Sequence, residues 1–375
     1  MNFDFGKEES ALRSRLKELI NGDAEKRLRD LKSEDPLVCL NVFQDYLSRL
    51  SGAGYLDLGL RDGKNSTALT SAQETLAGLS PSLFLSVETI RIFGRLVALF
   101  GTAQQKAEIL DPLKQGRFIG SIALSEGGMN LGNQVLETTA RAYDGKVQIN
   151  GSKDYVVNAP LADRFAVIAQ SDDNIIVALV DPAVEGIVIG ERVSTLGYEG
   201  TPIAPVTFDH VAVPWEACFD PFEPSDLLDL LHRWEDQALT AAGLGLMERS
   251  FRAALTHAKK HREGEKPLIA SQEIGFKLAE MLTLQQTAQL LAYRSAWMDA
   301  SGDSERDAMV HCAKVFCAES AEQVASQALQ VLGGRGFVRG NQAEESYRHA
   351  KYLQIAGTSS EMSRMRIGDG LLERV

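Results

Sequence analysis

The hydrophobic pattern changes twice along the chain, and this order constrains the fold more than any single motif. From residue 10 to about residue 116, apolar residues recur at three- and four-residue intervals, the period of an amphipathic helix. Residues 117–221 instead hold short runs rich in Val, Ile, Thr and Phe with turn residues between them, typical of strands in a barrel or sandwich. Long helical periods then return. We therefore predict a helical domain (1–116), a β domain (117–221) and a helical bundle (222–375).

Charge and hydropathy exclude two broad classes of protein. The net charge is −12 and no run of Lys or Arg is present, which argues against a nucleic-acid-binding surface. The most apolar stretch, Pro81–Gly101, is interrupted by Glu88, Arg91 and Arg95 at helical spacing, so it predicts a buried helix and no membrane span. The first ten residues are acidic and lack an apolar segment, so we expect a cytoplasmic protein.

The cysteines predict free thiols. Cys39, Cys218, Cys312 and Cys317 form no CxxC pair, and only Cys312 has a histidine beside it. Cys312 and Cys317 lie five residues apart in a helical pattern, which is a poor geometry for sharing one ion. We therefore expect neither a disulfide nor a metal site.

Several separated segments occur in an order that resembles one flavoprotein family. They are "IALSEGG" (Ile122–Gly128), "INGSKDYVVNAPLADRFAV", "LGYEGTPIAPVTFDHVAVP", "QVLGGRGF", "YRHAKYLQI" and "GTSSEMSR". Together they resemble the acyl-CoA dehydrogenase superfamily over nearly the whole chain. The resemblance implies an α+β multi-domain fold: an N-terminal helical domain, a middle antiparallel β-barrel and a C-terminal four-helix bundle. It also implies a homotetramer that binds FAD between subunits.

The resemblance also implies a reaction. In this family a carboxylate removes the α-proton of an acyl thioester, and the β-hydrogen leaves as hydride to flavin N5. Hydrogen bonds to the thioester carbonyl stabilise the developing enolate where water is excluded. The base needs a pKa near neutrality, which burial supplies.

Matching the family motifs to this chain gives a set of cofactor candidates. Ser125 and Tyr155 match positions near the flavin ring, and Val157 stands where Thr is common beside N5. His261 stands where an Arg reaches the pyrophosphate from another subunit, with Arg262 beside it, and Leu131 replaces the usual Ser of the pyrophosphate loop. The remaining matches lie on the nucleotide side: Gln330, Gly333, Gly334 and Thr358.

The expected catalytic glutamate is missing from its usual place. In "YLQIAGTSSEM" the residue before Gly357 is Ala356, and the segment is one residue shorter than the common pattern. The backbone of Ala356 and Gly357 would still border the substrate, with the Ala356 N–H offered to the thioester carbonyl. Some relatives carry the glutamate on an early bundle helix, ten residues before the second glycine of "GLG". Counting back from Gly245 gives Glu235.

Alternatives to this assignment remain open. Glu235 can instead be a carboxylate at a helix N-terminus that the helix dipole stabilises. Asp236 is a second candidate base, since an oxidase branch of the fold uses an aspartate, and the chain can also lack a base altogether.

The sequence thus predicts FAD-dependent α,β-dehydrogenation of an acyl-CoA or acyl-carrier-protein thioester. Glu235 would be the base, and an electron-transferring flavoprotein would accept the electrons. One alternative is a catalytically silent, flavin-poor subunit that completes the active site of a heterotetramer. Another is a different enzyme, with non-dehydrogenase chemistry, on the same fold.

Overall fold

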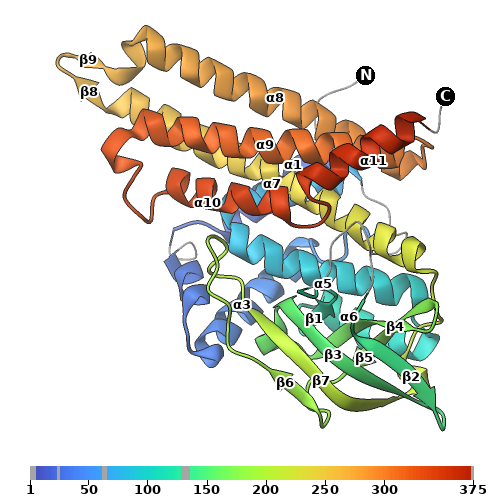
Figure 1. Cartoon of the computed structure of the whole chain (residues 1–375). Helices are drawn as coiled ribbons and strands as arrows, with labels where there is room; N and C mark the ends of the chain where they lie inside the picture. Colours follow the sequence, from blue (N-terminus) through green and yellow to red (C-terminus); the bar gives the residue numbers. More distant parts are fainter. Residues whose placement is uncertain (1–5, 23–25, 61–65, 128–135, 373–375) are drawn as a thin grey trace.

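The computed structural model describes residues 6–22, 26–60, 66–127 and 136–372 of the 375-residue chain. The first part is helical (Figure 1): α1 (Lys7–Leu19), η1 (Leu28–Lys32), α3 (Pro36–Ala53), α4 (Thr67–Leu79), α5 (Pro81–Phe100) and α6 (Ala103–Lys114). Local signals set several ends. The side chain of Asp35 caps the start of α3, which ends at Gly54 in the left-handed conformation.

The middle of the chain forms a curled seven-stranded sheet. Its strands are β1 (Gly120–Ala123), β2 (Thr139–Tyr143), β3 (Lys146–Val157), β4 (Arg164–Ser171), β5 (Asn174–Val180), β6 (Ile187–Ile189) and β7 (Ile203–Pro214). The order is β1-β4-β2-β3-β7-β6, with β5 on β4. Most pairings are antiparallel, as expected, but β4 pairs with β1 and β2 in parallel. The two long strands β3 and β7 build its centre, with register shifts along the pair.

Long helices make up the last part. They are α7 (Pro224–Lys260), α8 (Gln272–Ser301), α9 (Arg306–Leu332), α10 (Gln342–Ile355) and α11 (Ser360–Leu372), with a small hairpin of β8 (Arg262–Glu263) and β9 (Lys266–Pro267) between α7 and α8. Helices α7 to α10 pack on one another as the predicted bundle. Figure 1 shows this bundle on one side of the molecule and the sheet on the other, with α5 running between them.

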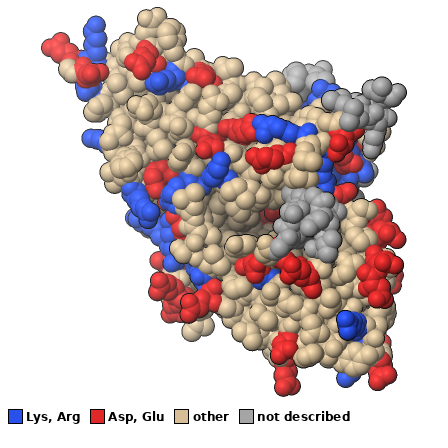
Figure 2. All heavy atoms as spheres, viewed as in Figure 1, with Lys and Arg blue, Asp and Glu red and all other residues tan. Residues whose placement is uncertain are grey.

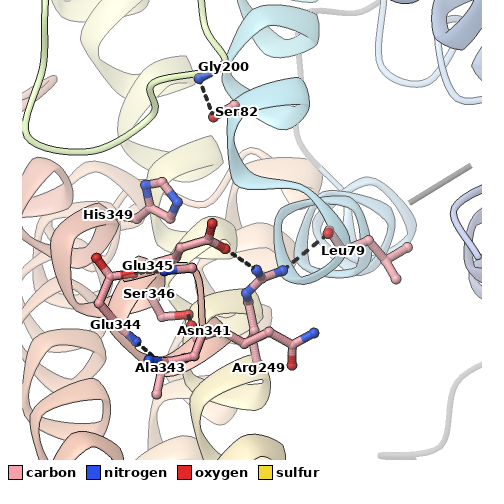
Figure 3. Close-up of polar contacts among 12 residues, drawn as sticks. Leu79, Ser82, Gly200, Arg249, Asn341, Ala343, Glu344, Glu345, Ser346 and His349 are labelled. Atoms are coloured by element: carbon pink, nitrogen blue, oxygen red, sulfur yellow. Dashed lines mark hydrogen bonds and ion pairs between the residues drawn. The ribbon is translucent and has the colours of Figure 1, made fainter. Parts of the chain in front are cut away.

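Close backbone contact joins the N-terminal helices to the bundle. Helix α4 crosses α7 where Gly78 meets Gly245, and a Cβ added to Gly245 would lie 2.5 Å from the Glu74 carbonyl oxygen. Arg249 stands one turn further along α7. It donates to the carbonyl of Leu79 and forms an ion pair with Glu345 at the start of α10 (Figure 3). These contacts fix α10, which carries part of the candidate site, against both α7 and α4.

The surface carries charges of both signs, and the most apolar helix is largely buried. On the face shown in Figure 2, Lys and Arg side chains are interspersed with Asp and Glu and form no single basic field. Pro81–Phe100 is a helix with a largely buried face, as predicted. None of the helices in the described residues combines the length and apolar character needed to cross a bilayer.

The predicted domain boundaries fall near element ends. Helix α6 ends at Lys114, before the boundary at residue 116. Phe222 pairs with Ile175 in an isolated bridge, so contacts to the sheet extend just past residue 221 before α7 begins. The four cysteines are free, and Cys312 is the one that is only partly buried.

Candidate active site

A cavity of about 590 Å³ lies where α5, the sheet, α7 and α10 meet. Its wall is mostly apolar. It brings together residues of α5, β1, β3, the loop before β7, α7 and α10, which are far apart in the sequence. Its lining includes Ser125, Tyr155, Val157, Tyr198, Glu235, Tyr352 and Ala356. The cavity is open to solvent on one side, where Tyr155, Leu196 and Ile355 are exposed. A concave, mostly apolar space with a few convergent polar groups is the usual form of a small-molecule site.

Glu235 supplies the carboxylate of this cavity. It lies well inside α7, which begins at Pro224, so the dipole of the first turn is too distant to explain it. No described residue donates a hydrogen bond to its carboxylate. Burial raises the pKa of Glu235 from an ordinary value of 4.5 to about 7, the charge of Asp236 adds to this rise, and Lys314 opposes it. A carboxylate with this pKa on the wall of a mostly apolar cavity is suited to accept a proton near neutral pH.

Asp236 faces away from the cavity. Its side chain is fully buried and does not line the cavity wall. One oxygen accepts the backbone N–H of Thr358 at 2.8 Å, and the same oxygen lies 3.4 Å from the Lys314 ammonium. The neighbouring acids on α7 therefore have different surroundings, and only Glu235 can reach a molecule in the cavity.

Two tyrosines pack at the side of the cavity next to Glu235. The rings of Tyr198 and Tyr352 are 5.0 Å apart, and Tyr198 also lies 4.6 Å from the ring of His349. The Tyr198 N–H donates to His349 Nδ1 at 2.9 Å, and Arg348 forms an ion pair with Glu199. These contacts hold the loop before β7 against α10. The sequence analysis did not single out either tyrosine.

The turn between α10 and α11 closes the cavity beside the base. The Ala356 N–H donates to the Tyr352 carbonyl at 2.9 Å, so this helix-end bond already engages the donor that the sequence analysis offered to a thioester carbonyl. Gly357 has φ +62°, a conformation that glycine adopts without strain. A Cβ at this position would lie 2.5 Å from an Asp236 oxygen. Ser359 Oγ accepts the Met362 N–H at 3.3 Å at the start of α11.

The flavin-ring candidates line the same cavity as Glu235. Ser125 follows β1, and Tyr155 and Val157 lie at the end of β3. Tyr155 is 60% exposed, and its ring is free to pack against a planar group. Leu131 lies outside the described residues.

The nucleotide-side candidates do not line this cavity. His261 and Arg262 belong to a second hollow of about 670 Å³, which Arg252, Lys260 and Arg335 make basic. Gln330, Gly333 and Gly334 are exposed at the end of α9, next to Arg335. Thr358 is fully buried, and its hydroxyl has no hydrogen-bond partner among the described residues.

Sequence reasoning found His261 and Arg262 in the basic hollow but missed its other cations. Arg252, Thr256 and Lys260 follow one another at four-residue intervals on α7, which places them on one face of the helix. That spacing is a signal in the sequence. The contribution of Arg335 depends on how α9 ends beside α7, which the sequence does not reveal.

Comparison with known proteins identifies the class. Residues 121–211 match the acyl-CoA dehydrogenase middle domain, and residues 233–372 match the acyl-CoA dehydrogenase C-terminal domain. The chain belongs to the acyl-CoA dehydrogenase family and is an oxidoreductase of that type.

Named relatives show the range of that class. The chain is 30% identical to the mitochondrial short-chain specific acyl-CoA dehydrogenase of Mus musculus, over 88% of this chain and 79% of that protein. It is also 30% identical to a 3-(aryl)acrylate reductase of Clostridium sporogenes, over 75% of this chain and 76% of that protein. The fold matches a glutaryl-CoA dehydrogenase from Mycobacterium smegmatis in complex with FADH2, with a TM-score of 0.89 and 20% identity over 98% of this chain and 95% of that one.

Proposed function

We propose that this protein is an FAD-dependent dehydrogenase of acyl thioesters in which Glu235 removes the α-proton. The observation that supports this most strongly is a carboxylate with a pKa of about 7 on the wall of a mostly apolar cavity. Proton removal next to a thioester carbonyl needs a base of this kind, ionised near neutral pH yet basic enough to take the proton. Membership of the acyl-CoA dehydrogenase family provides the substrate class.

The residues present fit FAD. The central cavity combines an apolar wall with the exposed ring of Tyr155, which suits a flat flavin ring. The basic hollow with Arg252, Lys260 and Arg262 suits a pyrophosphate, because guanidinium and ammonium groups bind phosphate oxygens strongly. The two sites are separate in one chain, which supports a tetramer in which a neighbouring subunit holds the nucleotide end. When bound, FAD supplies the acceptor for the β-hydrogen.

The chain's own residues have defined tasks in this proposal. The Glu235 carboxylate accepts the α-proton at its oxygen. The apolar wall, which includes Val157 and Leu231, excludes water and strengthens each polar contact inside. Tyr198 and Tyr352 pack beside the base and limit the space around the reacting carbon. The thioester carrier would be CoA or an acyl carrier protein, and an electron-transferring flavoprotein is the expected acceptor.

The second candidate is a silent subunit that completes the active site of a catalytic partner chain. The observation that favours it is the turn after α10, where Ala356 replaces the usual glutamate and its N–H is already bonded to Tyr352. Such a subunit would assemble as a heterotetramer and bind little flavin by itself.

A visible absorbance spectrum of the protein purified alone separates the two candidates. We expect flavin bands, present as isolated or after incubation with FAD, that bleach when one of a panel of acyl-CoA thioesters is added without oxygen. A protein that stays colourless after incubation with FAD would contradict the proposal and favour the silent subunit. Flavin bands that no CoA or carrier-protein thioester bleaches would point to a different reaction on the same fold.

A further inference from the structure

A buried ion pair lies behind Glu235, on the far side of α7 from the cavity. Asp236 follows Glu235 on α7, and Lys314 projects from α9 to within 3.4 Å of its carboxylate. The side chains are 0% and 1% exposed, respectively. Burying two opposite charges costs desolvation energy that their attraction often only partly returns, and well-packed apolar residues in place of such a pair are often as stable. The pair therefore calls for an explanation beyond stability.

The ion pair holds the turn between α10 and α11 through three backbone groups. The Lys314 ammonium donates to the carbonyls of Ala356 and Thr358 at 2.9 and 3.0 Å. Asp236 accepts the Thr358 N–H at 2.8 Å. The ammonium thus has two carbonyl acceptors and Asp236 Oδ1 has one N–H donor. Asp236 Oδ2 has no hydrogen-bond partner among the described residues and lies 3.9 Å from His311 Nδ1. The ammonium and carboxylate bind the same short segment, which forms the wall of the cavity next to the base.

Glycine at position 357 allows this turn to approach the two acids. A Cβ built there would lie 2.5 Å from an Asp236 oxygen and 3.4 Å from Glu235 Cγ. The backbone of Gly357 is thus packed against both side chains. A shift of the turn would change the space that Glu235 occupies as well as the contacts of Asp236.

We propose that Asp236 and Lys314 are positioning residues for Glu235. They hold the Ala356–Thr358 turn against the base, and the balance of their two opposite charges sets the electrostatic field at the Glu235 carboxylate. This inference rests on the proposed role of Glu235 as base. Neither residue lines the cavity, so both act through Glu235 and the turn and neither contacts the substrate.

The charged and titratable groups around the base come from four segments. They are His232 and Asp236 on α7, His311 and Lys314 on α9, Arg348, Lys351 and Tyr352 on α10, and Tyr198 in the loop before β7. Burial lowers the pKa of both histidines, which favours their neutral forms. Arg348 is engaged with Glu199 and Glu344. Asp236 and Lys314 thus form the charged pair behind the base, and they influence Glu235 in opposite directions.

Infrared spectroscopy over a pH series tests the charge balance without substrate. A protonated carboxyl group gives a carbonyl-stretch band, and the band that disappears in Glu235→Gln belongs to Glu235. The pH at which this band has half its full intensity, the midpoint, is then measured in the purified flavoprotein. In Asp236→Asn the amide oxygen still accepts the Thr358 N–H, but the negative charge is gone, so we expect the midpoint to fall by on the order of one pH unit. In Lys314→Met we expect a rise of similar size.

Glu88→Gln is the matched control. Glu88 on α5 is 4% exposed, accepts from the Tyr55 hydroxyl at 2.5 Å and pairs with Arg91, yet does not line the cavity. We expect this variant to lose stability without moving the Glu235 midpoint. An unchanged midpoint in Asp236→Asn, or shifts of the same direction in both variants, would overturn the charge-balance claim. Asp236→Asn alone decides it if Lys314→Met does not fold.

Hydrogen exchange tests the locking of the turn. In Lys314→Met we expect faster amide exchange over residues 355–359 than in wild type, and Glu88→Gln should leave that segment protected. Equal protection in all three proteins would overturn the positioning claim for the turn. Failure of the proposed function gives a different result. In that case the midpoints would still shift as described, but the flavin of Glu235→Gln would bleach with thioester at the wild-type rate.

Discussion

Glu126 is a buried carboxylate and Glu235 a half-buried one near the same cavity, and their surroundings give them opposite properties. Glu126 follows β1 and receives hydrogen bonds from Lys153 Nζ at 2.5 Å and from the backbone N–H groups of Glu137 and Thr138 at 2.6 and 3.0 Å. Burial pushes its pKa up, but these bonds outweigh burial and the pKa of Glu126 is lowered. Glu235 has no such donors, and its pKa rises to about 7. Burial alone therefore does not make a base; burial without donors does.

The comparison predicts that Glu126 serves stability. Glu126→Gln would leave the Lys153 ammonium buried without its carboxylate, and Lys153 is fully buried. Removing one partner of a buried pair typically costs about 3–5 kcal/mol of unfolding free energy. Denaturant unfolding of the variant and of wild type measures this difference. A loss below about 1 kcal/mol would mean that Glu126 is not held as described.

Glu235 should instead make the folded state less stable as pH rises. Its folded pKa of about 7 lies above the ordinary value of 4.5, so the folded protein holds a proton that the unfolded chain has released between those values. The stability that Glu235 contributes to the folded state is therefore fully present below pH 4.5 and is lost as the pH rises through about 7. The size is about 2–3 kcal/mol, allowing for partial exposure to the cavity.

The difference in unfolding free energy between wild type and Glu235→Gln isolates this effect, because all other titrating groups are common to both proteins. We expect wild type to lose stability relative to the variant as pH increases through this range. A difference that does not change with pH would show that Glu235 titrates normally, like an exposed carboxylate.

Restoring a glutamate at the usual place should have the smallest effect. In Glu235→Gln/Ala356→Glu the new side chain would start from a turn that is one residue shorter than the family pattern and whose end Lys314 and Asp236 hold. We expect the double variant to remain about as slow as Glu235→Gln in anaerobic flavin bleaching. Recovery to near the wild-type rate would mean that the shortened turn still directs a side chain at the substrate.

The sequence predicted more of the fold than of the site. The change from helical to strand periodicity near residue 117 and back near residue 225 is visible in the spacing of apolar residues, and the structure follows it. The parallel pairing of β4 with β1 and β2 is not visible, because it depends on contacts between strands that are distant in sequence. Curvature of the sheet depends on the same contacts.

Within the site, motif spacing located residues that lie on the same helix or strand. It did not locate residues that come into contact only when two helices pack together. Counting back from Gly245 along one helix is enough to select Glu235. The ion pair between Asp236 and Lys314 forms because α7 packs on α9, which the sequence does not reveal. The one indication of it in the sequence was a lysine among the apolar residues of α9. Thr358 matched a nucleotide-side position, yet it is buried beneath the turn and apart from both hollows.

The central claim is that Glu235 removes the α-proton, and single-turnover flavin bleaching as a function of pH tests it most directly. For wild type, mixed without oxygen with the thioester that bleaches the flavin, we expect the rate to rise through pH about 7 and level off above it, because the base must be ionised. Glu235→Gln should retain flavin and lose about a thousandfold in rate at all pH values. A variant that keeps its flavin and bleaches at a near-wild-type rate, with the same pH dependence, would contradict the account.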